Sequence, residues 1–275
     1  MPGNMRRRGG FLLAFTFAAM VAGTALAADA IRCTVVAEAK SGATIVRQGS
    51  CDQRFYPQST FKLALAMMGY DAGVLVDAHT PLWPYEERFK APQRVRKDTD
   101  PTRWLADSVV WYSQQLTRKL GAGSFSDYVA RFGYGNGDVS GTPGKNNGLT
   151  QAWLMSSLKI SADEQVDFLR RFVNGGLPIS ENAQAMTLAA TPTFAAGDGW
   201  TVKGKTGAGW LRDKAGKSDA DRPLGWFVGW AEKGDRRVVF ARLLVDTHPY
   251  KDEPISYVVR DQLIADLPGL VKGQP

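Results

Sequence analysis

The chain has 275 residues, of which 44% are hydrophobic and 22% are charged, and it carries a net charge of +7. This length and balance exclude a disordered or fibrous protein and allow a single large domain with an extensive core. Because the chain has only two histidines, His79 and His248, it has almost no material for a Ser-His-Asp triad or a His-rich metal site. We therefore expect no metal.

The N-terminus has the pattern of a secretory signal peptide, which we predict over residues 1–27. Three arginines (Arg6–Arg8) precede an apolar run, and a small-x-small site follows at Ala25-Leu26-Ala27. Cleavage is expected after Ala27, with Ala28 as the near alternative. A membrane anchor is the competing interpretation, but the apolar run is shorter than the ~20 residues that span a bilayer. Loss of the three arginines lowers the net charge from +7 to +4, and the mature protein is expected to be soluble, periplasmic and free of the membrane.

Two strands are predicted first in the mature chain, over residues 32–39 and 44–48, with a turn at Ser41-Gly42 between them. The only two cysteines, Cys33 and Cys51, lie in or just after this hairpin. An even count in an oxidising compartment favours a disulfide that closes the hairpin. Two free buried thiols are the alternative.

Helices are predicted through the middle of the chain, and strands return near its end. Thr60–Tyr70 is rich in Leu, Ala and Met and predicts a buried helix with Ser59 at or near its N-terminus. The other predicted helices span residues 104–120, 124–132, 166–173 (opened by a capping box from Ser161 to Glu164) and 255–267, and the other predicted strands span 200–207, 224–232 and 237–246. This order predicts an α+β fold: an antiparallel sheet built from both chain ends with flanking helices, plus an inserted helical lobe over about residues 75–190.

The densest basic tract is Arg94-Val95-Arg96-Lys97, which adjoins Asp98 and Asp100. With acidic neighbours, the tract favours a solvated loop over a nucleic-acid patch, and no nucleic-acid partner is expected. The mild positive bias of the whole chain favours an anionic small-molecule substrate.

Ser59 and Lys62 form a Ser-x-x-Lys pair at the start of the first predicted helix. Residues three apart share a helix face, so the amine can approach the hydroxyl. The apolar surroundings should lower the pKa of the amine and favour the neutral base that a serine nucleophile needs. The helix N-terminus adds free backbone N–H groups for an oxyanion. By itself, however, the pair is better explained by a capping serine and a snorkelling lysine.

A second element, Lys205-Thr206-Gly207, ends a predicted strand and is followed by Ala208-Gly209. A lysine and a threonine side by side can hold a substrate carboxylate, and Gly207 permits close backbone approach. Together the two elements match the signature of penicillin-recognising serine enzymes, in which Ser-x-x-Lys precedes Lys-Thr-Gly.

The remaining motifs are specific to one family. Where that signature often has Ser-Asp-Asn, the chain has Ser108-Val109-Val110 and Tyr134-Gly135-Asn136, and residues 153–161 read Trp-Leu-Met-Ser-Ser-Leu-Lys-Ile-Ser. With these motifs the chain, from about Thr34 to the C-terminal helix, resembles the class D β-lactamases, or oxacillinases. The resemblance implies a transpeptidase-like domain over residues 28–275 that hydrolyses β-lactam antibiotics and so gives resistance.

The resemblance also implies a role for each matched residue. Ser59 would be the nucleophile, and Lys62, carboxylated by CO2, would be the general base without any other cofactor. Ser108 would relay a proton to the lactam nitrogen. The indole N–H of Trp153 would stabilise the carbamate, and the alternative is that Trp153 only packs in the core. The backbone N–H groups of Ser59 and Ala208 would form the oxyanion hole, and Lys205 and Thr206 would bind the substrate carboxylate, with Gly207 beside them. Val110, Tyr134 and Asn136 would surround the pocket, and the role expected for Tyr134 and Asn136 is structural first and catalytic second.

One departure from the family pattern concerns the carboxylate of the substrate. Many members carry an arginine near the start of the last helix, where this chain has Pro254-Ile255-Ser256, with Arg260 a turn further on. Ser256 is therefore a candidate carboxylate ligand, and the preference among β-lactams stays open. Two other functions also stay open: a penicillin-binding transpeptidase or carboxypeptidase, and a β-lactam sensor domain that remains acylated. The class D-type spacing and the expected absence of an anchor or extra domain argue against the first. Such sensors are attached to a multi-span membrane segment, whereas only a cleavable leader is expected here, which argues against the second.

Overall fold

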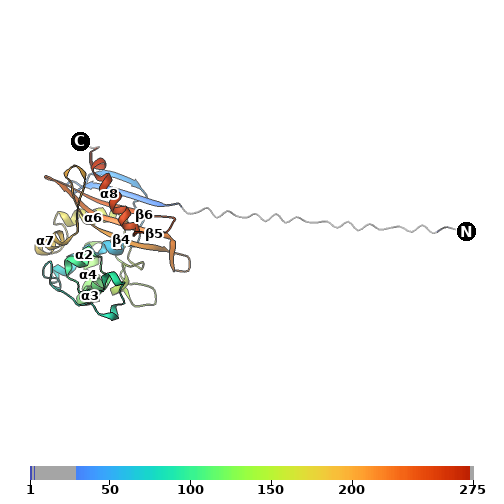
Figure 1. The fold of residues 1–275 in the computed structure, drawn as a ribbon, viewed down its shortest axis with the longest axis horizontal. Coiled ribbons are helices and arrows are strands. Elements are labelled where there is room, and N and C mark those ends of the chain that lie inside the picture. Colours follow the sequence, from blue (N-terminus) through green and yellow to red (C-terminus); the bar gives the residue numbers. More distant parts are fainter. Residues whose placement is uncertain (2, 4–28, 273–275) are drawn as a thin grey trace.

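The computed structural model describes residues 1, 3 and 29–272. Its framework is a six-stranded antiparallel sheet with the strand order β2-β1-β6-β5-β4-β3 (Figure 1). The N-terminal strand β1 pairs with the late strand β6, so the two chain ends build the sheet together. The predicted fold class is confirmed.

The strands are β1 (Ile31–Glu38), β2 (Thr44–Gly49), β3 (Thr193–Ala195), β4 (Thr201–Arg212), β5 (Ser218–Lys233) and β6 (Arg236–Val245). The α-helices are α1 (Lys62–Asp71), α2 (Pro101–Ala106), α3 (Val110–Leu120), α4 (Ala122–Phe132), α5 (Gly148–Gln151), α6 (Ala162–Val173), α7 (Glu181–Ala190) and α8 (Ile255–Lys272). Short 3₁₀ turns are η1 (Gln58–Phe61), η2 (Glu87–Phe89), η3 (Gln93–Val95) and η4 (Gly197–Gly199).

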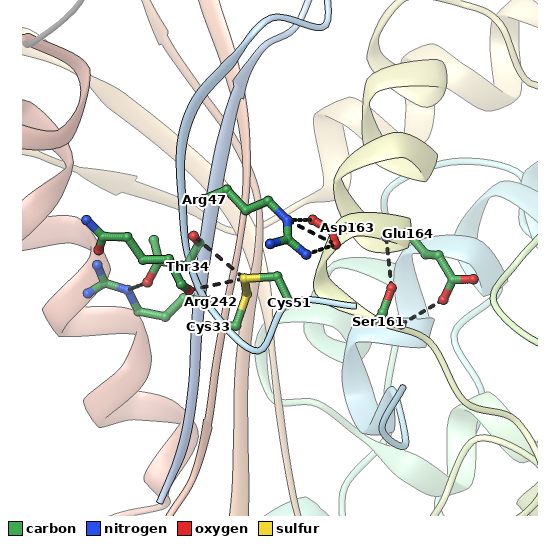
Figure 2. The surroundings of a disulfide bond; sticks show 9 residues. Cys33, Thr34, Arg47, Cys51, Ser161, Asp163, Glu164 and Arg242 are labelled. Atoms are coloured by element: carbon green, nitrogen blue, oxygen red, sulfur yellow. Dashed lines mark hydrogen bonds and ion pairs between the residues drawn. A yellow bond between two sulfur atoms is a disulfide. The ribbon is translucent and has the colours of Figure 1, made fainter. Parts of the chain in front are cut away.

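Helices cover both faces of the sheet. α8 lies along one face, and its residues Val259, Leu263 and Leu267, spaced one turn apart, are fully buried in a core shared with β4, β5 and β6. α6 packs against β1, β5 and β6 on the other face. The capping box predicted at its start is present, with Ser161 and Glu164 bonded reciprocally (Figure 2). Helices α2, α3 and α4 form a separate cluster beside the sheet (Figure 1).

The predicted helix over residues 104–120 is wrong near its start, where the structure has a break at residues 107–109. α2 ends at Ala106, α3 begins at Val110, and Ser108 lies between them with a φ of +59°. A residue in the left-handed region cannot continue a right-handed helix. The apolar spacing runs on across the break, so periodicity alone conceals it.

The predicted helix over Thr60–Tyr70 begins two residues later than expected. Ser59 lies inside the 3₁₀ turn η1, and the α-helix proper begins at Lys62. The hydroxyl of Thr60 donates to the carbonyl of Pro57 at 2.7 Å, which closes this turn. The nucleophile candidate therefore lies one turn ahead of a buried helix.

The strands β4 and β5 are longer than predicted, and they form one extended hairpin. β4 continues to Arg212 and β5 starts at Ser218, although the sequence pattern predicted an end at Gly207 and a start at Leu224. Among the added residues only Gly209 and Pro223 are buried, so these extensions lack the run of buried hydrophobic side chains that predicts a strand. The hairpin extends the sheet beyond the Lys-Thr-Gly element.

The predicted disulfide between Cys33 and Cys51 is confirmed, and the alternative of free thiols is wrong. The bond ties β1 to the segment that leads into η1 (Figure 2). Arg47 of β2 pairs with Asp163 of α6 at 2.8 Å beside it. Such exposed ion pairs contribute about 0–1 kcal/mol each, so the disulfide is the main constraint here.

The predicted signal peptide, residues 1–27, lies outside the described residues apart from residues 1 and 3. None of the helices that the structure describes combines the length and the apolar character needed to cross a bilayer. Cleavage after Ala27 or Ala28 stays a prediction.

Candidate active site

The structure brings Ser59 and Lys62 into direct contact. The Lys62 Nζ lies 2.9 Å from the Ser59 Oγ, and the lysine side chain is completely buried. Burial, together with the positive charges of Lys205 and Arg94, holds the pKa of Lys62 well below its ordinary value. The geometry therefore allows a neutral amine to exchange a proton with the serine hydroxyl.

Strand β4 brings a second lysine to the same place. The Lys205 Nζ donates to the Ser108 Oγ at 3.1 Å, across a separation of 97 residues in sequence. Lys205 is 2% exposed. Its burial, with the charges of Arg94 and Arg260, lowers its pKa to about 7. The break between α2 and α3 thus presents the Ser108 hydroxyl to the Lys-Thr-Gly strand.

The turn η1 packs directly on β4, and glycine is required at the contact. A Cβ on Gly207 would lie 2.8 Å from the carbonyl oxygen of Pro57 and 3.2 Å from the backbone nitrogen of Thr60. Because β3 pairs only with residues 201–203 of β4, the Lys-Thr-Gly segment that follows has no described strand on that edge. A ligand can approach β4 there and reach η1 at the same time.

Trp153 is fully buried, and its indole nitrogen has no hydrogen-bond partner among the described residues. Its ring stacks on Phe61, between Ser59 and Lys62 in sequence, with centroids 5.6 Å apart. Leaving a buried donor unpaired costs about 1–3 kcal/mol. The residue therefore packs in the core and also holds a free N–H for another acceptor.

The motif around Tyr134 and Asn136 braces the neighbouring chain. The Asn136 side chain donates to the carbonyl of Ser157 at 2.9 Å and accepts from the backbone N–H of Lys159 at 2.9 Å. The buried ring of Tyr134 meets Phe61 edge-on, with centroids 5.0 Å apart. Both contacts support the structural role expected first for this motif. Val110 opens α3 two residues after Ser108, and its side chain is half-buried.

The start of α8 lies beside β5, close to the Lys-Thr-Gly strand. A Cβ on Gly225, which pairs with Ala208, would lie 3.1 Å from the Ile255 carbonyl carbon. Ser256 is buried in the first turn of α8. The guanidinium of Arg260 bonds Asp261 at 2.7 and 3.1 Å, and its charge still reaches Lys205. Both residues therefore stay candidates for the carboxylate side of the site.

Similarity to known proteins identifies the family. The family model of the penicillin-binding protein transpeptidase domain matches residues 32–264. The crystal structure of the class D β-lactamase OXA-427 superposes with a TM-score of 0.80 at 42% identity, covering 88% of this chain and 98% of that one. β-Lactamase OXA-9 of Klebsiella pneumoniae is 49% identical over 245 residues, covering 88% of this chain and 89% of OXA-9.

The chain belongs to the class D β-lactamases. β-Lactamase OXA-1 of Escherichia coli is also similar, at 35% identity over 215 residues, which cover 77% of this chain and 75% of OXA-1. The resemblance predicted from the motifs is confirmed, and so is class D serine β-lactamase activity as the class of enzyme. Among the described residues no cluster of His, Cys, Asp and Glu could hold a metal ion.

Sequence reasoning missed one residue in the site of this class D β-lactamase, Gln58. It precedes Ser59 with a φ of +53°, is 4% exposed, and has no hydrogen-bond partner for its buried Nε2. Its backbone N–H donates to the carbonyl of Trp153 at 3.1 Å. A Cβ on Gly209 would lie 2.2 Å from the Gln58 Nε2. The only sequence signal was Gly209, the third glycine in the β4 strand, which marks this close approach.

Replacing Gly207 by alanine is expected to lower kcat/KM for a chromogenic cephalosporin by about 100-fold, because a displacement of about 1 Å at a reacting group can lose that much. The new methyl group meets backbone atoms of Pro57 and Thr60, so β4 and the turn that carries Ser59 must separate. Steady-state kinetics measure the effect. Gly123→Ala in α4, where a Cβ meets nothing within 4 Å, should keep the parent activity. Equal activity of the two variants would contradict the prediction.

Proposed function

We propose that this class D β-lactamase hydrolyses β-lactam antibiotics through an acyl-enzyme on Ser59, with carboxylated Lys62 as the general base, and thereby confers resistance. The observation that carries the proposal is the buried Lys62 amine, 2.9 Å from the Ser59 hydroxyl. A serine hydroxyl is a weak nucleophile until a neighbouring base removes its proton. An amine kept neutral by burial is such a base, and it is also the form that reacts with CO2.

Acylation uses both hydroxyls of the site. The neutral Lys62 amine adds CO2 and releases a proton, which leaves a carbamate. The carbamate takes the proton of Ser59 as its Oγ attacks the lactam carbonyl. When the ring C–N bond breaks, Ser108 gives a proton to the departing nitrogen, and Lys205, which lies 3.1 Å away, can supply the replacement. The product is an ester between Ser59 and the opened drug.

Deacylation explains why a carbamate serves better than a free amine. A free amine that has taken the serine proton becomes an ammonium, which is a poor base for the second half of the reaction. The carbamic acid is a far stronger acid than an ammonium, so after acylation it gives its proton to solvent or to the now neutral Lys205 and becomes a carbamate again. The carbamate then deprotonates a water molecule that attacks the ester carbonyl, and it passes that proton to Ser59 as the serine leaves. The unpaired indole N–H of Trp153 is the donor that we assign to the carbamate, whose pocket Val110 helps to line.

The substrate lies along β4 in this proposal. The backbone N–H groups of Ser59 and Ala208 form the oxyanion hole, a device worth about 3–4 kcal/mol per donor in hydrolases. Lys205 and Thr206 bind the drug carboxylate. Gly207 lets η1 approach, and Ser256 adds a hydroxyl on the side of α8. Tyr134 and Asn136 shape the pocket.

The remaining parts of the proposal concern the context of the enzyme. We infer a signal peptide over residues 1–27, a mature periplasmic domain over 28–275 with its helical lobe at about 75–190, and no cofactor other than the CO2 carried by Lys62. No nucleic-acid or membrane partner is proposed. The small-molecule partner is a β-lactam, which the names of the relatives OXA-9 and OXA-1 as β-lactamases support.

One assay tests the proposed function against its rivals. Stopped-flow mixing with a chromogenic cephalosporin should give steady turnover over many equivalents of substrate. A burst of one equivalent followed by little further hydrolysis would contradict the proposal. That outcome would favour a penicillin-binding transpeptidase or carboxypeptidase, or a β-lactam sensor that stays acylated.

A further inference from the structure

Ser108 needs support from its surroundings, because its backbone is held in an unfavourable conformation. Its φ of +59° lies in the left-handed region, which non-glycine residues adopt only when neighbouring contacts impose it. The hydroxyl must also stay 3.1 Å from the Lys205 Nζ. Two backbone bonds frame the turn: Asp107 N–H to Arg103 at 2.8 Å and Val109 N–H to Trp104 at 3.1 Å.

The basic tract found in the sequence supplies further contacts to this turn. The Arg94 Nη1 donates to the carbonyl of Asp107 at 3.0 Å, and the Lys97 Nζ pairs with the Asp107 carboxylate at 2.7 Å. The tract itself is anchored on α3, because the indole N–H of Trp111 donates to the carbonyl of Val95 at 3.0 Å. Asp107, the residue directly before Ser108, is thus held through both its backbone and its side chain.

We propose that Arg94 and Lys97 are positioning residues that hold the Asp107 turn so that the Ser108 hydroxyl is presented to Lys205 and to the departing lactam nitrogen. This inference rests on the proposed function, in which Ser108 delivers a proton during acylation. The third cation of the tract has a different task. Arg96 donates to the carbonyl of Ala91 at 2.8 Å and faces Glu87 at 3.6 Å, so its contacts stay inside the loop.

The contacts are too exposed to matter much for global stability. The side chains of Lys97 and Asp107 are 45% and 36% exposed, and exposed ion pairs stabilise a fold only slightly. Their loss should therefore leave the molecule folded while Ser108 moves away from its position. Measurements of the reaction rate and of the melting temperature can then distinguish a positioning role from a role in folding.

The experiment compares Arg94→Ala and Lys97→Ala with the matched control Arg96→Ala in the full-length enzyme. Single-turnover mixing of excess enzyme with a chromogenic cephalosporin measures acylation, and decay of the isolated acyl-enzyme measures deacylation. We expect acylation to slow by about tenfold in the first two variants. Deacylation should be unchanged in Lys97→Ala and should slow less than acylation in Arg94→Ala, because the charge of Arg94 also lowers the pKa of Lys62. All rates of Arg96→Ala should equal those of the parent. Melting temperatures should stay within about 1–2 °C of the parent. Arg94→Lys, which keeps a donor, should recover part of the acylation rate.

Three results would overturn the positioning role. In the first, Arg94→Ala and Lys97→Ala acylate at the rate of the parent. In the second, both steps slow together and the melting temperature falls, which is the mark of a structural role. In the third, raising the pH fully restores acylation in Arg94→Ala, which would mean that Arg94 acts only through its charge on Lys62 and Lys205. If the parent itself shows no acylation phase, the proposed function fails and this role fails with it.

Discussion

Replacing Ser59 by alanine is expected to lower kcat/KM for β-lactam hydrolysis by at least about 10⁴-fold, because among the described residues the Ser59 hydroxyl is the one that lies within hydrogen-bond distance of the Lys62 amine. The change removes one oxygen from a half-buried side chain and leaves the backbone of η1 intact. The variant should therefore fold like the parent. Turnover of a chromogenic cephalosporin measures the loss, and mass spectrometry of the intact protein detects the acyl adduct.

The control for this variant replaces a serine in a different helix. Ser124 lies exposed in α4, so Ser124→Ala should show the turnover and the drug adduct of the parent. Ser59→Ala should show neither. An acyl adduct that persists in Ser59→Ala would assign the covalent chemistry to a different nucleophile and would remove the basis of the proposed mechanism.

The sequence predicted those parts of the site that depend on local spacing. Ser59 and Lys62 lie three residues apart, so any helical turn brings them together, whether it is the predicted α-helix or the observed 3₁₀ turn that leads into α1. The capping box of α6 is likewise a short-range pattern and was found as predicted. In both cases the interacting groups are fixed by a few consecutive backbone angles.

Contacts between distant segments were beyond such reasoning. Lys205 reaches Ser108 across 97 residues, and only the packing of β4 against the helical lobe creates that pair. The left-handed backbone of Ser108 and Gln58 leaves no trace in hydrophobic periodicity, because the apolar positions on either side keep their spacing. The resemblance to a family indicated that Ser108 belongs to the site, but it did not predict the break between α2 and α3 that exposes its hydroxyl.

The burial of Lys62 makes the free energy of unfolding depend on pH. The Lys62 amine is protonated in the unfolded chain below its ordinary pKa of 10.5, whereas burial first, and then Lys205 and Arg94, lower its pKa in the folded chain. Folding therefore releases a proton, and stability falls as the pH drops from about 10.5 towards the folded-state pKa. The enzyme gives up stability at neutral pH in order to keep a neutral amine beside Ser59.

Replacing Lys62 by methionine is expected to lower kcat by about 10²–10⁴-fold, the range that general-base catalysis supplies, and to make the protein more stable in CO2-free buffer. Methionine fills a similar volume, so no cavity forms, and it has no proton to lose on folding. Because the base is absent from both steps, any ester that does form on Ser59 should persist and be visible by mass spectrometry. Urea unfolding measures the gain in stability.

The matched control for this variant is Lys203→Met on the same strand as Lys205. The Lys203 amine donates to the carbonyl of Leu188 at 2.9 Å, away from Ser59, so its loss should leave kcat near that of the parent. A Lys62→Met variant that turns over like Lys203→Met would exclude Lys62 as the base.

Removal of CO2 distinguishes a carbamate from a free amine at Lys62. A lower pH protonates the amine and displaces CO2, so the activity of the parent should fall as the pH drops through the lowered pKa of Lys62 and should recover when bicarbonate is added. Lys62→Met should not respond to bicarbonate at any pH. In the proposed mechanism the carbamate would accept a hydrogen bond from the buried, unpaired N–H of Trp153, whereas a free amine does not need this donor. If thorough removal of CO2 leaves the turnover of the parent unchanged, the base is the amine itself, and deacylation then requires another group to take up its proton.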